Sequence, residues 1–67
     1  MNEQLKNAFS PIRIIYAEKS MIELNEVLTK TNCRRILESI GYSLESYVLT
    51  NYGTTIINYD TQKDSQN

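Results

Sequence analysis

Cys33 is the side chain of this sequence best suited to covalent chemistry, since it is the single cysteine and is followed directly by Arg34 and Arg35. A basic setting lowers the pKa of a thiol and so favours the nucleophilic thiolate. A catalytic cysteine also needs an adjacent base, and the chain contains no histidine. Cys33 moreover falls on the apolar side of a predicted helix. We therefore expect a buried, unreactive thiol and a protein that is not an enzyme.

Metal and cofactor sites are not expected from the remaining residues. One cysteine without any histidine cannot build a cysteine–histidine zinc site. The carboxylates of Glu23, Glu26 and Glu38 recur at helical spacing, which is typical of a solvated stripe and not of a converging catalytic pair. The two glycines, Gly41 and Gly53, are both accounted for by turns, so the sequence has no glycine-rich phosphate loop.

Phosphate binding is a second chemistry that the sequence allows. The candidate nucleic-acid residues are Lys30, Arg34, Arg35, Asn51 and Tyr52. The net charge is −1, from seven basic and eight acidic side chains, so no global field attracts nucleic acid. We favour the interpretation that the three cations belong to a solvated helix face, where they pair with Glu26 and Glu38.

The stretch YVLTNYGTTIINY, residues 47–59, predicts a β-hairpin. Strand formers flank the letters NYG, and Gly53 stands where a three-residue loop needs a positive φ and a bulge. This loop sets three residue pairs, Thr50 with Thr54, Val48 with Ile56, and Tyr47 with Ile57. Because side chains alternate along a strand, both faces of the hairpin then carry apolar groups.

The two-sided hairpin indicates a contact with another protein chain. A helix can cover one face of a small sheet, and an uncovered apolar patch often marks a contact site. Tyrosine is also enriched at interfaces, and this chain has five tyrosines. The predicted protein-contact residues are Tyr16, Tyr47, Leu49, Ile57 and Tyr59. A sheet edge is the other way in which such a sheet can bind a partner.

The longest predicted element is a helix over residues 21–40. Ser20 and Glu23 have the spacing of a capping box at its start. Gly41 can take the left-handed conformation that ends a helix. Residues 29–32, TKTN, have poor helix propensity, so two short helices separated at this point are the alternative to one long helix.

Two further elements precede this helix. Residues 2–9 predict a short helix, with Leu5, Ala8 and Phe9 on one side, which ends before Pro11. Residues 12–18 are rich in β-branched and aromatic side chains and predict a strand. The short helix is one candidate to cover part of the second sheet face.

These elements predict an α+β fold, in which one long helix or two short ones pack on a small three-stranded antiparallel sheet. We assign residues 1–59 to one small domain and residues 60–67 to a flexible polar tail. A break in the helix would instead give the element order of a winged-helix domain, with Arg34 and Arg35 near the start of a recognition helix. The negative net charge counts against this alternative.

We therefore expect a small non-catalytic protein that binds another protein or a second copy of itself, as an inhibitor, an adaptor or a minor subunit of a larger assembly. A winged-helix-like DNA-binding regulator that acts as a dimer is the alternative. The sequence lacks a signal-peptide pattern and a membrane-spanning apolar run. We thus expect it in the cytoplasm, or inside an organelle that encodes it, with no cofactor, no metal and no membrane contact.

Overall fold

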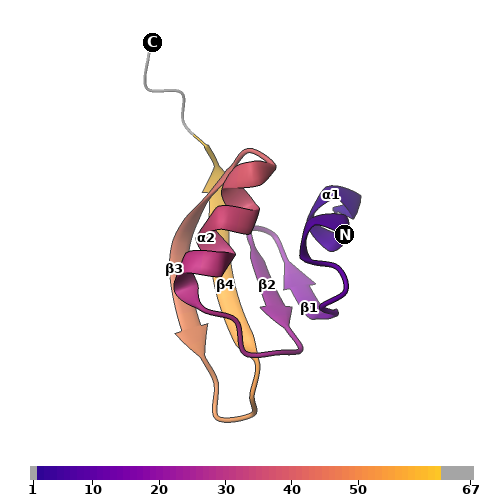
Figure 1. The fold of residues 1–67 in the computed structure, drawn as a ribbon, viewed down its shortest axis with the longest axis vertical. Coiled ribbons are helices and arrows are strands. Elements are labelled where there is room, and N and C mark those ends of the chain that lie inside the picture. Colours follow the sequence, from indigo (N-terminus) through magenta and orange to yellow (C-terminus); the bar gives the residue numbers. More distant parts are fainter. Residues whose placement is uncertain (1, 63–67) are drawn as a thin grey trace.

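The computed structural model describes residues 2–62, which form two helices and a four-stranded antiparallel sheet (Figure 1). In chain order the elements are α1 (Glu3–Phe9), β1 (Ile14–Glu18), β2 (Met21–Leu24), α2 (Lys30–Ser39), β3 (Tyr42–Leu49) and β4 (Thr55–Thr61). The spatial order of the strands is β1-β2-β4-β3. The α+β class predicted from the sequence is confirmed, but the sheet has one strand more than predicted.

The additional strand is β2, in the segment that we predicted to be the first turn of a long helix. Ile22 and Leu24 alternate with half-exposed residues and are both fully buried. β2 lies between β1 and β4 and pairs with both. Ser20 does not cap a helix, because it stands in the β1–β2 turn with a φ of 67°. The capping-box prediction was therefore wrong, since pairing on both sides of β2 outweighs a local helix signal.

Helix α2 begins inside the TKTN stretch that we considered a weakness in the helix. Thr29 is its N-cap, and the Thr29 hydroxyl accepts a 3.1 Å hydrogen bond from the backbone N–H of Asn32. Threonine is a poor residue for a helix interior and a good one for an N-cap. The helix ends at Ser39, and Gly41 follows its C-cap residue Ile40 with a φ of 89°, which confirms the predicted left-handed conformation there. Residues 21–40 therefore form one strand and one short helix, in place of the predicted long helix or pair of short helices.

The order of elements also differs from that of a winged-helix domain. A strand stands where the winged-helix alternative requires a helix before α2. The winged-helix alternative is therefore wrong. The predicted pairing of Glu26 with Lys30 along one helix is also wrong, because Glu26 precedes α2.

The hairpin of β3 and β4 has the predicted register. Val48 pairs with Ile56 and Tyr47 with Ile57, and the backbone N–H of Thr50 donates to the carbonyl of Thr54 over 3.0 Å. Gly53 has a φ of 76°. β4 continues to Thr61, so it includes two residues that we assigned to the polar tail. Residues 63–67 of that tail lie outside the described residues.

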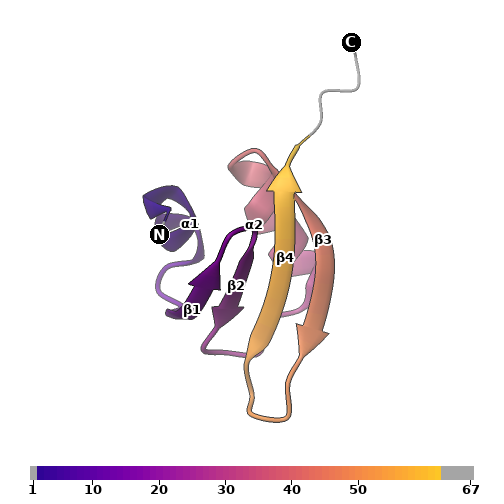
Figure 2. The same ribbon diagram turned by 180° about the vertical axis from the view of Figure 1, so that it is seen from behind.

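Both helices lie on the same face of the sheet (Figures 1 and 2). Helix α1 does not cover the second face, because Leu5 and Phe9 point into the same core as the side chains of α2. This core joins residues of both helices, β2 and β4, which are Leu5, Phe9, Ile22, Leu24, Cys33, Leu37 and Ile57. The opposite face of the sheet carries no helix in the described part of the chain, as Figure 2 shows.

Candidate functional site

We call the helix-free side of the sheet the open face. Strand side chains alternate between two faces, so the burial of Ile22, Leu24, Thr55 and Ile57 on the helix side places their neighbours on the other. The open face comprises Ile15, Tyr16, Glu18, Met21, Glu23, Ser43, Glu45, Ser46, Val48, Ile56, Asn58 and Asp60.

One row of the open face crosses all four strands. Tyr16 pairs with Glu23, Glu23 with Ile56, and Ile56 with Val48. Tyr16 and Val48 are 48% and 54% exposed, and Ile56 is half-buried. Apolar side chains therefore reach from one edge of the sheet to the other, with a single carboxylate between them.

Each edge strand has a bulge. In β1 the register shifts between Ile14 and Tyr16, and in β3 it shifts between Leu44 and Ser46. Bulges interrupt the regular row of N–H and C=O groups on which an added strand would pair. Both edges of the sheet are therefore interrupted as templates for an added strand.

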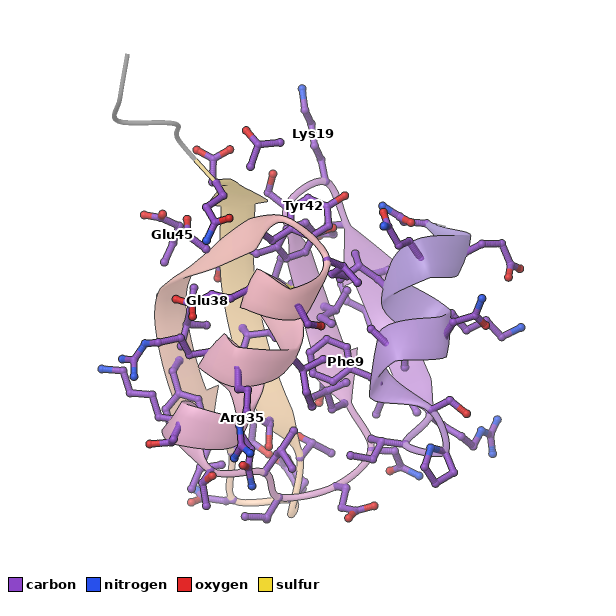
Figure 3. The ribbon with its side chains drawn as sticks, turned by 45° about the horizontal axis from the view of Figure 1, so that its top comes forward. Phe9, Lys19, Arg35, Glu38, Tyr42 and Glu45 are labelled. Atoms are coloured by element: carbon purple, nitrogen blue, oxygen red, sulfur yellow. The ribbon has the colours of Figure 1, made fainter. Side chains whose placement is uncertain are left out.

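The charges of the two layers differ in sign. Every charged side chain within the strands is a carboxylate, and these are Glu18, Glu23, Glu45 and Asp60. The helices carry four cations, Lys6, Lys30, Arg34 and Arg35, and two carboxylates, Glu3 and Glu38. All six side chains are exposed, and the net charge of the helices is positive. Figure 3 labels the side chains of Arg35 on α2 and Glu45 on β3. The open face is therefore apolar and acidic.

Several hydrogen bonds order polar groups of the open face, and one of them joins Ser43 to Glu45 over 3.0 Å. The Tyr16 hydroxyl donates to the Glu18 carboxylate over 2.5 Å, and this bond and the negative charge of Glu18 raise the pKa of Tyr16. The Ser46 hydroxyl donates to the side-chain oxygen of Asn58 over 2.9 Å. These contacts lie beside the apolar row and leave its side chains uncovered.

The five predicted protein-contact residues do not share one surface. Tyr47, Leu49, Ile57 and Tyr59 lie on the helix-covered face, and only Tyr16 lies on the open face. Ile57 is fully buried, and the Tyr47 hydroxyl donates a 2.6 Å hydrogen bond to the carbonyl of Leu28. The two faces of the hairpin were predicted correctly. The helices, however, cover the face of Tyr47 and Ile57, which we expected to stay uncovered. Ile14 lies on the helix-covered face and Tyr16 on the open face, because the bulge in β1 interrupts the alternation of side chains between them.

Val48 and Ile56 lie on the open face and were not among the five predicted protein-contact residues. The signal for them was present, since the hairpin register placed both on one face. What the sequence lacked was evidence for which of the two apolar faces α2 covers.

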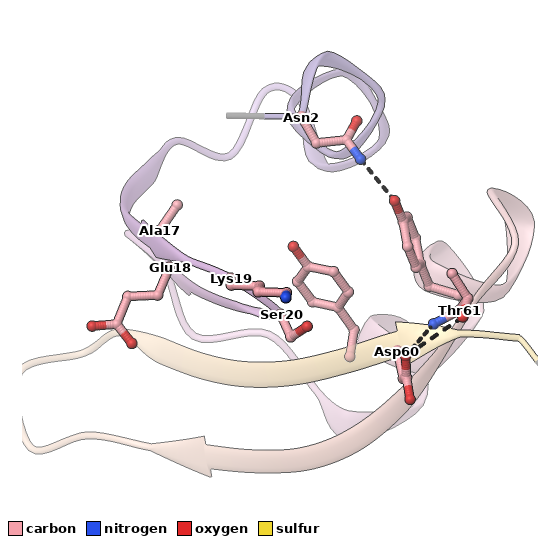
Figure 4. Close-up of a pocket in the computed structure, with 9 residues that line it drawn as sticks. Asn2, Ala17, Glu18, Lys19, Ser20, Asp60 and Thr61 are labelled. Carbon is pink, nitrogen blue, oxygen red and sulfur yellow. Dashed lines mark hydrogen bonds between the residues drawn. The ribbon is translucent and has the colours of Figure 1, made fainter.

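A groove with a volume of about 710 Å³ lies at the end of the sheet where the chain turns from β1 to β2 (Figure 4). The Asn2 amide donates a 2.7 Å hydrogen bond to the Tyr42 hydroxyl on one side of it, and the Tyr42 and Tyr59 rings meet edge to face with centroids 5.0 Å apart. Burial, followed by the nearby Tyr42, raises the pKa of Tyr59, and a backbone group of Ser20 opposes this rise. The groove is also lined by Glu18, Lys19 and Asp60, so its mixed charges favour no class of ligand.

Cys33 is fully buried on α2, and burial raises the pKa of its thiol. Arg34 and Arg35 are exposed and do not counter this effect. Among residues 2–62, no three histidine, cysteine, aspartate or glutamate side chains lie close enough together to hold a metal ion.

The predicted nucleic-acid residues lie on two separate elements. Lys30, Arg34 and Arg35 are exposed on α2, where Arg35 also donates a hydrogen bond to the side chain of Asn32. Asn51 and Tyr52 are exposed in the β3–β4 loop. With the winged-helix order excluded, the fold no longer assigns α2 to a nucleic-acid groove. Within the described residues, no helix is long and apolar enough to cross a membrane.

Comparison with known proteins gives no relative, since no family model, no curated protein and no solved structure matches this chain. Its function is therefore inferred from the geometry of the open face.

Proposed function

We propose that this chain is a small non-catalytic protein that binds a partner protein on its open face. One observation carries the proposal: both helices pack on the same side of the sheet and leave the row of Tyr16, Ile56 and Val48 uncovered on the other. Contiguous exposed apolar groups on a soluble protein often mark a contact site. Inhibitor, adaptor and minor subunit are all forms of this function.

The charges indicate what kind of partner fits. Glu23 interrupts the apolar row, and Glu18, Glu45 and Asp60 lie to one side of it, toward the β1–β2 turn. A partner surface with apolar side chains flanked by lysine or arginine would be complementary to this pattern, and complementarity of charge speeds association and excludes other partners. The proposed partner is therefore a different protein with a basic and apolar surface.

A second copy fits less well. A two-fold contact between open faces would bring the carboxylates of both copies together, because each copy contributes the same patch. Like charges at close range oppose association. This argument replaces our expectation of self-association through the sheet.

Photo-crosslinking tests the proposal. Benzoylphenylalanine is placed at position 48 on the open face or, as a matched control, at position 34 on α2, since both positions are exposed. We expect position 48 to give one major adduct in cells of the source organism and position 34 to give none of the same mass. The cross-linked peptide of the partner should be rich in lysine or arginine.

A charge reversal distinguishes specific docking from mere proximity. Glu45→Lys should lower the yield of the adduct at position 48 several-fold, whereas Lys30→Glu on α2 should leave it unchanged, since both side chains are exposed. An adduct of twice the 7.8 kDa chain mass would show that a second copy covers the open face. The same set of adducts from positions 34 and 48 would refute a docking site on the open face.

A further inference from the structure

Tyr52 is the most exposed large apolar side chain of the described residues, with 90% of its surface accessible. It stands in the loop of the β3–β4 hairpin, which extends beyond the first turn of α2 (Figure 1). Folding leaves almost all of this aromatic ring in water, so the ring contributes little to the chain's own core. Tyrosine is one of the residue types that most often dominate the binding energy of an interface.

The loop that carries Tyr52 is held by a chain of hydrogen bonds. The Thr50 hydroxyl oxygen accepts from the backbone N–H groups of Tyr52 and Thr54, at 3.1 and 3.3 Å. The hydroxyls of Thr50 and Thr54 are 2.6 Å apart. The Thr54 hydroxyl is also 2.7 Å from the carboxylate of Glu23 on β2.

The direction of this chain follows from the carboxylate at its end. An ionised carboxylate only accepts hydrogen bonds, so Thr54 donates its hydroxyl proton to Glu23. Thr50 must then donate its own proton to Thr54, and its lone pairs remain free for the two backbone N–H groups. Every hydroxyl proton has one acceptor, and the loop backbone is tied to β2 and not only to its own hairpin.

Such a loop holds the backbone of Tyr52 in place before a partner arrives. Binding then orders few loop residues, which lowers the entropic cost of association. The loop adjoins the open face, because Val48 lies two residues before Thr50 and is 54% exposed. Glu23, which ends the hydrogen-bond chain, lies in the apolar row itself.

We infer that the β3–β4 loop anchors the interface by inserting Tyr52 into an apolar pocket of the partner protein, while Val48 and Ile56 meet the surface beside that pocket. This inference rests on the proposed function. The partner it fits has a basic, apolar surface next to a pocket wide enough for one phenol ring.

Crosslinking from the loop tests the inference with the full chain. Benzoylphenylalanine at position 52 should yield an adduct with the same protein that position 48 captures. Tyr52→Ala should weaken the binding of that protein at least tenfold, whereas Tyr52→Phe should keep it within threefold. The melting temperature of both variants should equal that of the unchanged chain, because Tyr52 is 90% exposed.

Thr54→Val and Thr54→Ser separate anchoring from simple exposure of the ring. Valine removes the hydroxyl and serine retains it, so only valine should weaken partner binding and raise the mobility of the Tyr52 amide in NMR relaxation. Both variants are compared at a temperature at which each is fully folded.

The outcomes distinguish this inference from the proposed function. An adduct at position 48 with no loss of affinity in Tyr52→Ala would overturn the anchor and keep the open face as the docking site. No adduct at either position would overturn both. An adduct at position 52 alone would show that the loop binds without the open face, which contradicts the inference as stated.

Discussion

The Thr54 hydroxyl donates a 2.7 Å hydrogen bond to the carboxylate of Glu23 and so joins the end of the hairpin to β2. The residue pair links two strands that are neighbours in the sheet but come from distant parts of the sequence. Thr54 is only 5% exposed, so this bond is largely shielded from water. It connects the apolar row of the open face with the loop that presents Tyr52.

Removing this hydroxyl should destabilise the fold. Thr54→Val leaves the Glu23 carboxylate and the Thr50 hydroxyl without their partner, and a shielded polar group without a partner costs about 1–3 kcal/mol. Urea unfolding followed by circular dichroism measures the change. Thr54→Ser, which keeps the hydroxyl, should lose clearly less stability, and equal losses would show that the hydrogen bonds contribute nothing.

Thr55 fixes the connection between β2 and α2 from a fully buried position. Its hydroxyl donates to the carbonyl of Glu26 over 2.7 Å and accepts from the N–H of Leu28 over 3.0 Å. Thr55→Val has nearly the same shape but leaves both backbone groups without this partner, so we expect a loss of about 2 kcal/mol or more. Thr55→Ser is the control, and chemical denaturation is the measurement. A valine variant as stable as the parent would contradict the role of the hydroxyl.

The observed start of α2 can be tested against the start expected from the capping box. Thr29→Ala should cost about 1 kcal/mol, because Thr29 caps α2. Ser20→Gly should raise the free energy of unfolding by a few tenths of a kcal/mol or more, because Ser20 has a φ of 67° that glycine adopts without strain. If Ser20 were a helix cap, the glycine variant would not be stabilised. Thermal and urea unfolding of both variants distinguish a helix that starts after Thr29 from one that starts after Ser20.

The buried thiol predicts a pH dependence of stability. Burial raises the pKa of Cys33 above its ordinary value of 9.0, so the folded state holds this proton more tightly than the unfolded state does. The stability that the protonated Cys33 thiol contributes is fully present below pH 9.0, and it is lost as the pH rises through the folded-state pKa. We therefore expect the free energy of unfolding to fall as the pH rises from 9.0 to the folded-state pKa of Cys33.

Thiol labelling checks the same property directly. At pH 8 a disulfide reagent should label the folded chain far more slowly than the chain in denaturant, because the buried thiol is shielded and is not a thiolate. Arg34→Gln and Arg35→Gln should leave the labelling rate of the folded chain unchanged, since both side chains are exposed. Rapid labelling that these variants slow would indicate a reactive cysteine.

Local patterns predicted those parts of the fold whose interactions are local. Asn2 accepts hydrogen bonds from the first backbone N–H groups of α1, and this short helix was found where the spacing of Leu5 and Phe9 placed it. The register of the hairpin followed from the position of Gly53. In each case the residues that define the structure are near one another in the sequence.

Helix propensity misled where the decisive partners are distant. The segment Met21–Leu24 has both the capping pattern of a helix and the alternation of a strand. Its strand conformation depends on pairing with β1 on one side and with β4 on the other, where Met21 pairs with Asn58. The pairing with β1 is a local hairpin, but the pairing with β4 forms only after distant parts of the chain come together, so no local pattern reports it.

The candidate site likewise has one part that the sequence predicts and another that depends on the tertiary structure. The sequence by itself determined that the hairpin has two apolar faces and that Cys33 lies on the apolar side of its helix, because both follow from the period of the backbone. Only the tertiary structure decided which hairpin face the helices cover, and therefore that Val48 and Ile56, and not Tyr47 and Ile57, stay uncovered. Either face is apolar enough to be buried. The choice depends on how the whole set of core side chains fills the space between sheet and helices, which is a property of the assembled fold.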